Sequence, residues 1–341
     1  MNRLHNNKKI TINDIAEKAK VSKGTVSRVL SDSPLVKTET RERIKKIIKK
    51  NGYEPNYIAR SLAIKRTYTL ALILQDITNP FFSAIAKGVD DTARKYNFNV
   101  ILCNTNYNKE TEKQYISMVL RKRVDGIIIT PVDVDLDNIK LIETGKLPFF
   151  ILNSWSDRNE INYIVGDNYK GAQMAMNYLI EIGHRKIAYI KGPHIQGCEE
   201  RLEGYKKTLK DNCINISNNL VIGTAYNSHD GYKLTKKLIE TEKGITAIFA
   251  INDIVAIGAM KAIFDNNLRI PDDISLVGYD DIDISSMVRV PLTTINQQES
   301  MQGIIACEQI IKLIETNKSS ESIRIVIKPK LIIRKSCRRI K

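Results

Sequence analysis

Residues 11–30 (TINDIAEKAKVSKGTVSRVL) place small hydroxyl, small apolar and cationic side chains along one face of a predicted helix. Serine, threonine and glycine allow a close approach to phosphates, and lysine and arginine form charge-assisted hydrogen bonds with phosphates or base edges. The chemistry favoured by this face is therefore the reading of DNA. Its members are Ser22, Lys23, Gly24, Thr25, Ser27 and Arg28.

Two short amphipathic helices are expected to position this face. Apolar residues fall at i, i+1 and i+4 in the first helix and at i, i+3 and i+4 in the second, so each helix buries one stripe. Val21 is expected to fill the turn between them. This pattern predicts a helix-turn-helix. The apolar residues are Ile15, Ala16, Ala19, Val26, Val29 and Leu30.

The positive charge of the chain is concentrated near this motif. Residues 1–68 hold 17 lysines and arginines against 6 acidic residues, which accounts for +11 of the formal net charge of +15. A basic patch confined to one module is typical of a nucleic-acid-binding domain. Six of the cations lie between Arg41 and Lys50, on a helix expected over residues 38–51. They either contact phosphates or only solvate the outer face of that helix.

Length and composition indicate a globular protein of several domains. The chain has 341 residues, of which 43% are hydrophobic, enough for two or three domains. No apolar run reaches the length of a membrane span, and the N-terminus MNRLHNNKKI lacks the apolar core of a secretory signal. A cytoplasmic protein without membrane contact is therefore expected. The five cysteines and four histidines lack the spacing of metal ligands, so we expect no metal or cofactor.

From residue 69 onward, apolar strands alternate with amphipathic helices, which predicts an α/β fold of two successive wound sheets and hence two lobes. In open α/β sheets ligands bind beyond the carboxyl ends of the strands. Residues 76–82, Thr130, Asn153, Asn252 and Asp280 should therefore meet at a cleft between the lobes. The predicted strands are TLALILQD, FNVILCN, DGIIITP, PFFILN, INYIVGD, KIAYIKG, LVIGTA, TAIFAIN and ISLVGYD. The predicted helices cover residues 82–96, 110–121, 136–144, 169–182, 199–212, 231–242 and 255–266.

An enzymatic function receives little support from the sequence. The P-loop, dinucleotide-binding, zinc-protease and serine-hydrolase motifs are all missing. The adjacent pairs Asp280–Asp281 and Asp272–Asp273 are sequence neighbours whose side chains need not face one site, so they do not form a general acid and base pair. No catalytic residue is expected. A transport-type solute-binding protein would share a two-lobed core but would be exported and would not need residues 1–68.

In family terms, the chain resembles the LacI/GalR family of bacterial transcription regulators over nearly its whole length. The resemblance implies an N-terminal all-α helix-turn-helix headpiece (1–53), a hinge helix and linker (54–68) and a two-lobed periplasmic-binding-protein-like core of type I (69–341). It also implies a repressor controlled by a small molecule. The matching segments are TINDIAEKAKVSKGTVSRVL, VKTETRERI, GYEPNYIARSL, DITNPFF, VDGIII, GHRKIAYI, RLEGYKK, NDIVAIGAM, VGYDDIDISS and PLTTINQ.

The resemblance assigns expected roles to residues at the DNA. Lys23 and Gly24 match positions that vary with the operator sequence, and Arg28 matches an arginine that reads bases or anchors the backbone. Leu62 matches a hinge leucine that is pushed between base pairs in the minor groove. Unstacking a base step in this way costs a few kcal/mol. The alternative is that residues 53–66 form a plain linker. Further DNA contacts are implied for Thr11, Ser22, Thr25, Ser27, Lys37 and Asn56.

Two positions in the headpiece depart from the family pattern. Lys20 stands where a glycine is frequent, which costs roughly 1 to 2 kcal/mol if the residue must be left-handed. Lys37 stands where a serine usually caps the third helix, so a cap worth about 1 kcal/mol is lost unless Thr38 replaces it.

The resemblance also implies a set of effector-binding residues in the cleft. Arg201 and Asp280 are expected to form hydrogen bonds jointly with sugar hydroxyls, both from the second lobe. Asn252 and Gln297 match further hydrogen-bonding positions, and aromatic residues match the walls that stack on a sugar ring. The full expected set is Asn79, Phe81, Phe82, Thr130, Asn153, Arg201, Tyr226, Asn252, Asp280 and Gln297.

The effector class is expected to be a mono- or disaccharide. Many sugar-binding relatives carry Asp-Arg where this chain has Asn153-Ser154, so a purine remains an alternative. A protein corepressor is a further alternative, but Glu308 stands where the catabolite-control branch uses a contacting arginine. The chain shows no heptad tail after Ile333, which favours a homodimer over a tetramer.

Overall fold

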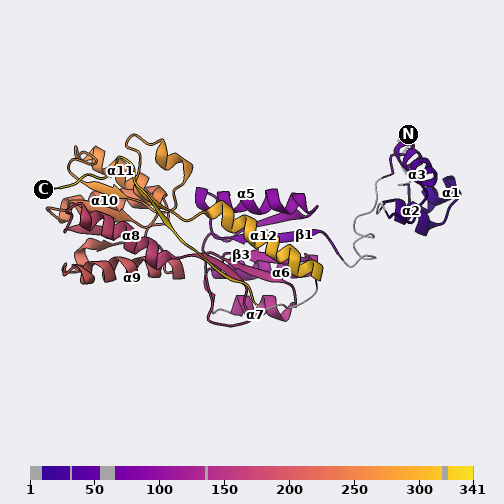
Figure 1. Cartoon of the computed structure of the whole chain (residues 1–341), viewed down its shortest axis with the longest axis horizontal. Coiled ribbons are helices and arrows are strands. Elements are labelled where there is room, and N and C mark those ends of the chain that lie inside the picture. Colours follow the sequence, from indigo (N-terminus) through magenta and orange to yellow (C-terminus); the bar gives the residue numbers. More distant parts are fainter. Residues whose placement is uncertain (1–9, 31–32, 54–65, 135–136, 317–321, 341) are drawn as a thin grey trace, which may run out of the picture. The chain divides into compact units, whose positions relative to one another are not determined.

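The computed structural model describes residues 10–30, 33–53, 66–134, 137–316 and 322–340. The chain divides into two compact units, Met1–Thr67 and Tyr68–Lys341 (Figure 1). The two units are described one after the other.

The smaller unit is a three-helix headpiece that confirms the predicted helix-turn-helix. Its helices are α1 (Ile12–Lys18), α2 (Lys23–Leu30) and α3 (Thr38–Lys50). The apolar stripes of the three helices meet in one core, because each places its hydrophobic residues on a single face. Val21 is half-buried against this core, as expected for the residue that fills the turn. The buried residues are Ile15, Ala16, Ala19, Val26, Val29, Ile44 and Tyr53.

Both unusual positions in the headpiece behave as the sequence predicts. Lys20 adopts the left-handed conformation (φ 50°), although its side chain makes that region unfavourable. Lys37, rather than Thr38, is the N-cap residue of α3, and its side chain makes no capping hydrogen bond. The headpiece therefore carries two local energetic costs that its small core must offset.

The larger unit begins with a six-stranded parallel sheet, in the order β11-β5-β4-β3-β1-β2. Helices α5 and α12 cover one face and pack on Leu70, Leu72 and Leu74, while α6 and α7 cover the other and pack on Ala71 and Ile73. The strands are β1 (Thr69–Leu74), β2 (Asn99–Asn104), β3 (Gly126–Ile129), β4 (Phe149–Leu152), β5 (Tyr163–Gly166) and β11 (Arg324–Ile327). The helices are α5 (Pro80–Lys95), α6 (Lys109–Lys122), α7 (Asp137–Thr144) and α12 (Glu299–Thr316).

A second lobe is built on a four-stranded parallel sheet, in the order β7-β6-β8-β9. Its strands are β6 (Ile187–Ile190), β7 (Val221–Ile222), β8 (Ala247–Ala250) and β9 (Ser275–Val277). Its helices are α8 (Asn168–Glu181), α9 (Gln196–Asp211), α10 (Ser228–Thr241) and α11 (Asp253–Asp265), with short 3-10 turns η1 (Asn218–Leu220) and η2 (Asp283–Ser286). Two further strands, β10 (Thr294–Asn296) and β12 (Lys330–Ile332), pair antiparallel. The prediction of two wound sheets is confirmed.

Three segments of chain pass between the two lobes. They connect β5 to α8, β10 to α12, and β11 to β12. Strands β5 and β11 are neighbours at one edge of the first sheet, so two of the passages leave from that edge. The opposite edges are β2 in the first sheet and β7 in the second.

Some sequence predictions need correction. The segment FNVILCN was expected to be a buried strand, but β2 is an edge strand and Leu102 is 41% exposed. The segment LVIGTA forms a strand of only two residues, Val221–Ile222. The prediction of two sheets in simple succession also missed that the chain returns to the first lobe to form α12 and β11. A run of hydrophobic residues predicts the burial of side chains poorly when the strand lies at the edge of a sheet, because such a strand has a neighbour on one side only.

The helices among the described residues include none long and apolar enough to cross a membrane. Among the same residues there is no group of three or more histidine, cysteine, aspartate or glutamate side chains arranged to hold a metal ion.

Candidate nucleic-acid interface and effector cleft

The residues predicted to contact DNA lie on the solvent face of α2, opposite Val26 and Val29. Five of the six are exposed and Thr25 is half-buried. The Ser22 hydroxyl accepts a hydrogen bond from the Thr25 backbone N–H at 3.2 Å and lies 3.0 Å from the Thr25 hydroxyl. These two hydroxyls thus shape the first turn of α2, where free N–H groups and the helix dipole favour an anion such as phosphate. The six side chains are brought together on one surface.

The other headpiece residues that were predicted to contact DNA differ in their surroundings. The Thr11 hydroxyl caps α1: it accepts from the Asp14 N–H and donates to the Asp14 carboxylate at 2.8 Å, so it has a structural role whatever it contacts. Lys37 is exposed at the start of α3. Asn56 and Leu62 lie outside the described residues. Sequence reasoning missed Leu35, which is 80% exposed in the loop before α3.

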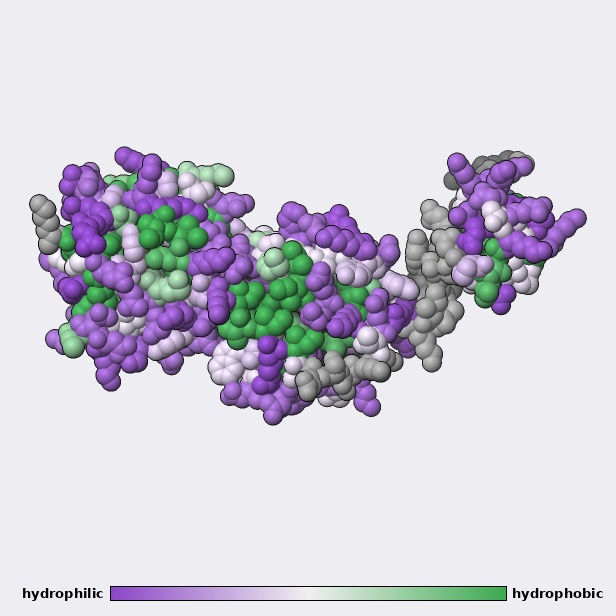
Figure 2. Space-filling model, in the orientation of Figure 1, coloured by the Kyte–Doolittle hydropathy of each residue, from purple (hydrophilic) through white to green (hydrophobic). Residues whose placement is uncertain are grey.

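In the space-filling view, most of the visible surface of the Met1–Thr67 unit is hydrophilic (Figure 2). Its formal charge is dominated by lysine and arginine. A cationic, polar surface around an exposed recognition helix is what binding to a polyanion requires.

Arg201 and Asp280 are brought together in the second lobe, as the sequence predicts. Arg201 comes from the first half of α9, and Asp280 follows β9. Their side chains are almost fully buried, with 6% and 3% of each residue exposed, and Arg201 Nη1 lies 3.8 Å from Asp280 Oδ1. Asp280 has a positive φ of 113°, and an isolated bridge to Asn296 ties its backbone to the crossover before α12.

Neighbouring groups that sequence reasoning missed hold Arg201 in place. Its Nε donates to Asn168 Oδ1 at 2.9 Å and its Nη1 donates to the Ile251 carbonyl at 2.7 Å. The guanidinium lies over the Tyr279 ring, 3.7 Å from the ring centroid, which adds a cation–π interaction. Asn168 starts α8 immediately after a crossover, so the orientation of Arg201 depends on the passage between the lobes.

Gln297 joins this cluster from the crossover between β10 and α12. Its Nε2 donates to Asp280 Oδ1 at 2.6 Å, while its Oε1 is buried without a hydrogen-bond partner among the described residues. Burial raises the pKa of Asp280 well above its usual range, although the Arg201 charge and the Gln297 hydrogen bond oppose this rise. A buried polar cluster with unsatisfied acceptors is suited to a ligand that brings hydroxyl donors.

Asn252 is less available than predicted, because its side chain caps α11 by accepting from the Val255 N–H at 2.9 Å. The next residue, Asp253, is fully buried and accepts three hydrogen bonds: from Thr294 Oγ1 (2.6 Å), Ser285 Oγ (2.7 Å) and the Ile282 N–H (3.0 Å). Burial raises the pKa of Asp253 to about 7, against the lowering effect of these donors. Asp253 thereby fixes the loop that follows Asp280.

The first lobe contributes a second group of predicted residues. Asn79 caps α5 by accepting from the Phe81 N–H at 3.0 Å. Phe81 and Phe82 are each 3% exposed and belong to the core of the lobe, so they are less open to a ligand than the predicted stacking role requires. Thr130 is buried, and its hydroxyl accepts from the Gln75 N–H at 3.2 Å. Asn153 is left-handed (φ 56°), and its Oδ1 is buried with no partner in the described part of the chain.

Side chains from the two lobes also contact each other directly. Tyr226, 42% exposed, packs against Tyr107 with ring centroids 5.4 Å apart and planes at 66°. Trp155, the one tryptophan of the chain, exchanges backbone hydrogen bonds with the Gln196 amide at 2.9 and 3.2 Å, and its indole N–H donates to Glu200. Sequence reasoning missed Tyr107, Trp155 and Glu200. The signal available for Tyr107 was an aromatic side chain in the turn three residues after strand β2.

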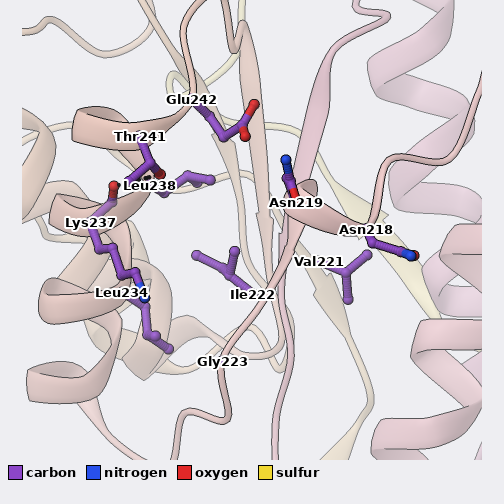
Figure 3. Close-up of a pocket in the computed structure, with 10 residues that line it drawn as sticks. All are labelled: Asn218, Asn219, Val221, Ile222, Gly223, Leu234, Lys237, Leu238, Thr241 and Glu242. Atoms are coloured by element: carbon purple, nitrogen blue, oxygen red, sulfur yellow. Dashed lines mark hydrogen bonds between the residues drawn. The ribbon is translucent and has the colours of Figure 1, made fainter.

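A separate pocket of about 470 Å³ lies at the outer edge of the second lobe, between α10 and the η1–β7 segment (Figure 3). No predicted effector residue lines it, so it is distinct from the cleft. The lining residues are Asn218, Asn219, Val221, Ile222, Gly223, Leu234, Lys237, Leu238, Thr241 and Glu242.

Comparison with known families matches both units. Residues 11–56 fit the family described as bacterial regulatory proteins of the lacI family. Residues 67–335 fit the family of periplasmic binding proteins and sugar-binding domains of the LacI family. The chain belongs to the LacI family. It is therefore a DNA-binding transcriptional regulator, and the resemblance inferred from its motifs is confirmed.

Individual LacI-family relatives cover nearly the whole chain. It is 36% identical to the ribose operon repressor of Halalkalibacterium halodurans, over 96% of each chain. It is 34% identical to the transcriptional repressor PurR of Histophilus somni, over 96% of this chain and 98% of that one. The lac repressor dimer bound to operator and the anti-inducer ONPF superimposes with a TM-score of 0.85 at 29% identity, over 96% of this chain and 99% of that one. These relatives are transcriptional regulators rather than enzymes, and the structural match confirms the predicted fold class.

Proposed function

We propose that this LacI-family protein represses transcription by binding a pseudo-palindromic operator as a homodimer, and that a small polyhydroxylated effector between the lobes changes its operator affinity. The buried Arg201–Asp280 pair carries this proposal. A guanidinium and a carboxylate 3.8 Å apart, each oriented by other partners, provide donors and acceptors for neighbouring hydroxyls of one ligand.

A sugar is the proposed effector class. The ribose operon repressor supports it as a relative that matches 96% of the chain. The cleft offers carboxylate, amide and guanidinium groups rather than an open aromatic slot, and hydrogen-bonding groups of this kind fit the many hydroxyls of a sugar. We propose Asn79, Thr130, Asn153, Asn252 and Gln297 as additional polar contacts, and Phe81, Phe82 and Tyr226 as apolar walls.

A purine is the second candidate effector, because a PurR relative is nearly as similar. Tyr107 and Tyr226 supply aromatic surface from both lobes, which is the observation that favours this candidate. A protein corepressor is less favoured, since Glu308 is exposed and acidic where a contacting arginine would be expected.

At the DNA, we propose that Lys23 and Gly24 read bases and that Ser22, Thr25, Ser27, Arg28 and Lys37 position the duplex backbone. Residues 54–68 are proposed as the hinge between the headpiece (1–53) and the effector unit (69–341), with Asn56 on a phosphate and Leu62 between base pairs. In this account the protein acts in the cytoplasm, on chromosomal DNA, without a cofactor and without a catalytic step.

Operator selection followed by calorimetry tests the proposal. The full-length protein is expected to select two half-sites related by two-fold symmetry. One saccharide from a panel is expected to bind the protein and to change operator affinity. Binding of a purine together with failure of every sugar would replace the effector class, and binding of a single asymmetric half-site by a monomer would contradict the dimeric operator complex.

A further inference from the structure

The pocket of about 470 Å³ at the outer edge of the second lobe has the dimensions of a ligand site (Figure 3). Strand β7 has two residues and pairs with β6 on one side only, so the sheet ends there. The pocket opens between this sheet edge and helix α10. Small-molecule sites usually occupy about 300 to 1,000 Å³, so the pocket is large enough for a small organic ligand.

The floor of the pocket is apolar. Its side chains belong to the core of the second lobe or pack against it, namely Val221, Ile222, Leu234 and Leu238. Gly223 is left-handed (φ 56°), and a Cβ atom at this position would lie 2.3 Å from Leu234 Cδ2. Helix α10 and the chain after β7 therefore approach closely at this end of the pocket. Apolar surface that remains open beside such a contact favours the apolar part of a ligand.

Polar groups lie around this floor. Lys237 is exposed and has no ion-pair partner among the residues that the structure describes. The charge of Glu242, by contrast, is compensated by Lys186, whose Nζ lies 3.4 Å from Glu242 Oε2. The side-chain amide of Asn219 provides one further donor and acceptor group. The pocket thus combines an apolar floor with one uncompensated positive charge.

We propose that this pocket is an accessory binding site for an amphipathic monocarboxylate, a small molecule with an apolar body and one carboxylate group. The apolar body would cover Ile222 and Leu234, and the carboxylate would accept a charge-assisted hydrogen bond from Lys237. A sugar fits this floor poorly, because its hydroxyls would lose water there without gaining hydrogen-bond partners. No residue proposed for the effector lines the pocket, so this site goes beyond the sugar-binding function and does not depend on it.

Calorimetry of the full-length protein with octanoate tests the site, and octanamide serves as the uncharged analogue of similar shape. Lys237→Glu reverses the charge at the pocket. Lys236→Glu makes the same change at the neighbouring exposed residue of α10, which does not line the pocket, and is the matched control. Ile222→Phe enlarges a side chain of the floor and should obstruct both probes. Thermal unfolding shows whether each variant is folded.

Octanoate should bind the native protein about 10-fold more tightly than octanamide, because a hydrogen bond to a charged partner contributes more than a neutral one. Lys237→Glu should weaken octanoate binding by about 10-fold or more and leave octanamide binding within about 2-fold, since only the carboxylate is repelled. Lys236→Glu should keep octanoate binding within about 2-fold, because solvent and salt screen its charge.

Three results would overturn the accessory site. They are a native protein that does not bind octanoate, equal native affinity for octanoate and octanamide, and native octanoate affinity in Lys237→Glu or in folded Ile222→Phe. Because Lys237 is exposed, its variant remains decisive even if Ile222→Phe fails to fold. None of these results depends on whether a sugar binds the cleft, so failure of the accessory site and failure of the sugar-binding function are distinguished.

Discussion

Arg201 and Asp280 face each other inside the second lobe at 3.8 Å, a distance that favours electrostatic attraction but exceeds a hydrogen bond. Each group is instead held by its own partners: Arg201 by Asn168 and the Ile251 carbonyl, and Asp280 by Gln297. The pair is preorganised, because binding a ligand would not require either side chain to find its position. Because Asn168 and Gln297 lie beside chain passages between the lobes, we expect occupancy of the proposed effector site to be coupled to movement of the lobes.

Replacement of the Asp280 carboxyl group should uncouple the effector from DNA. Asp280→Asn is expected to weaken effector binding by about 10- to 100-fold, since leaving a buried hydrogen-bonding group without its partner costs roughly 1 to 3 kcal/mol. Operator binding without effector should remain near native, because the residue belongs to the other unit of the chain. Isothermal titration and DNA-binding titrations check both effects, with the surface variant Asp265→Asn as control. Native effector affinity in Asp280→Asn would show that the cleft is assigned to the wrong residues.

Lys23 and Lys37 should differ in how their loss affects DNA binding. Lys23→Ala is expected to change the preferred half-site base, with a discrimination of about 1 to 3 kcal/mol for a lost base contact. Lys37→Ala should weaken binding to all sequences alike and reduce the salt dependence, as loss of one phosphate contact does. Selection from a randomised half-site, repeated at two salt concentrations, separates the two outcomes. A uniform loss with native sequence preference in Lys23→Ala would assign Lys23 to a phosphate instead.

Thr11 offers a test that separates helix capping from DNA contact. Thr11→Ala should lower headpiece stability by about 1 kcal/mol, because the capping box with Asp14 is lost. Thr11→Ser keeps the capping hydroxyl and is the matched control. If the hydroxyl serves only α1, folded Thr11→Ala should bind the operator with close to native affinity despite its lower stability, and Thr11→Ser should stay close to native in both measurements. A large loss of operator affinity in folded Thr11→Ala that Thr11→Ser does not show would instead place the hydroxyl next to a phosphate.

Asp253 should make the free energy of unfolding decrease as pH rises, the opposite of the usual effect of an aspartate. Its folded pKa of about 7 exceeds the ordinary value of 3.8, so the folded state binds the proton more tightly. This contribution to the free energy of unfolding is present in full below pH 3.8 and decreases as pH rises through 7, by up to about 4 kcal/mol. Asp253→Asn cannot titrate and cannot accept all three hydrogen bonds, which costs about 2 to 3 kcal/mol.

The deficit of Asp253→Asn relative to the native protein should therefore be larger at pH 5 than at pH 8. Denaturant unfolding at several pH values measures the difference, in which the effects of all other titrating groups cancel. Asp265→Asn, on the surface, should show a deficit within about 0.5 kcal/mol at every pH. A deficit that is the same at pH 5 and pH 8 would mean that Asp253 is already charged in the folded state throughout this range, and would contradict the raised pKa.

The sequence alone predicts most of the fold, because hydrophobic periodicity reports which face of an element is buried. The helix-turn-helix and the two wound sheets follow from local patterns, whereas the pairing of Arg201 with Asp280 was implied by the family resemblance. The return of α12 and β11 to the first lobe does not, since it depends on long-range packing such as the close crossing of Gly88 and Gly303 with the facing helix backbones. Tyr107, Trp155 and Glu200 were missed for the same reason: their partners lie across the cleft and far away in sequence.

The central claim is that a sugar in the cleft changes operator affinity, and one titration tests it most directly. The full-length protein, at fixed salt, is titrated with its selected operator in the absence and presence of each saccharide and purine of the panel. We expect one saccharide to change operator affinity by about 10-fold or more, within the usual range of allosteric coupling, and Asp280→Asn to abolish this change while still binding the operator. Operator affinity that no saccharide changes, in a protein that binds the operator specifically, would contradict the account.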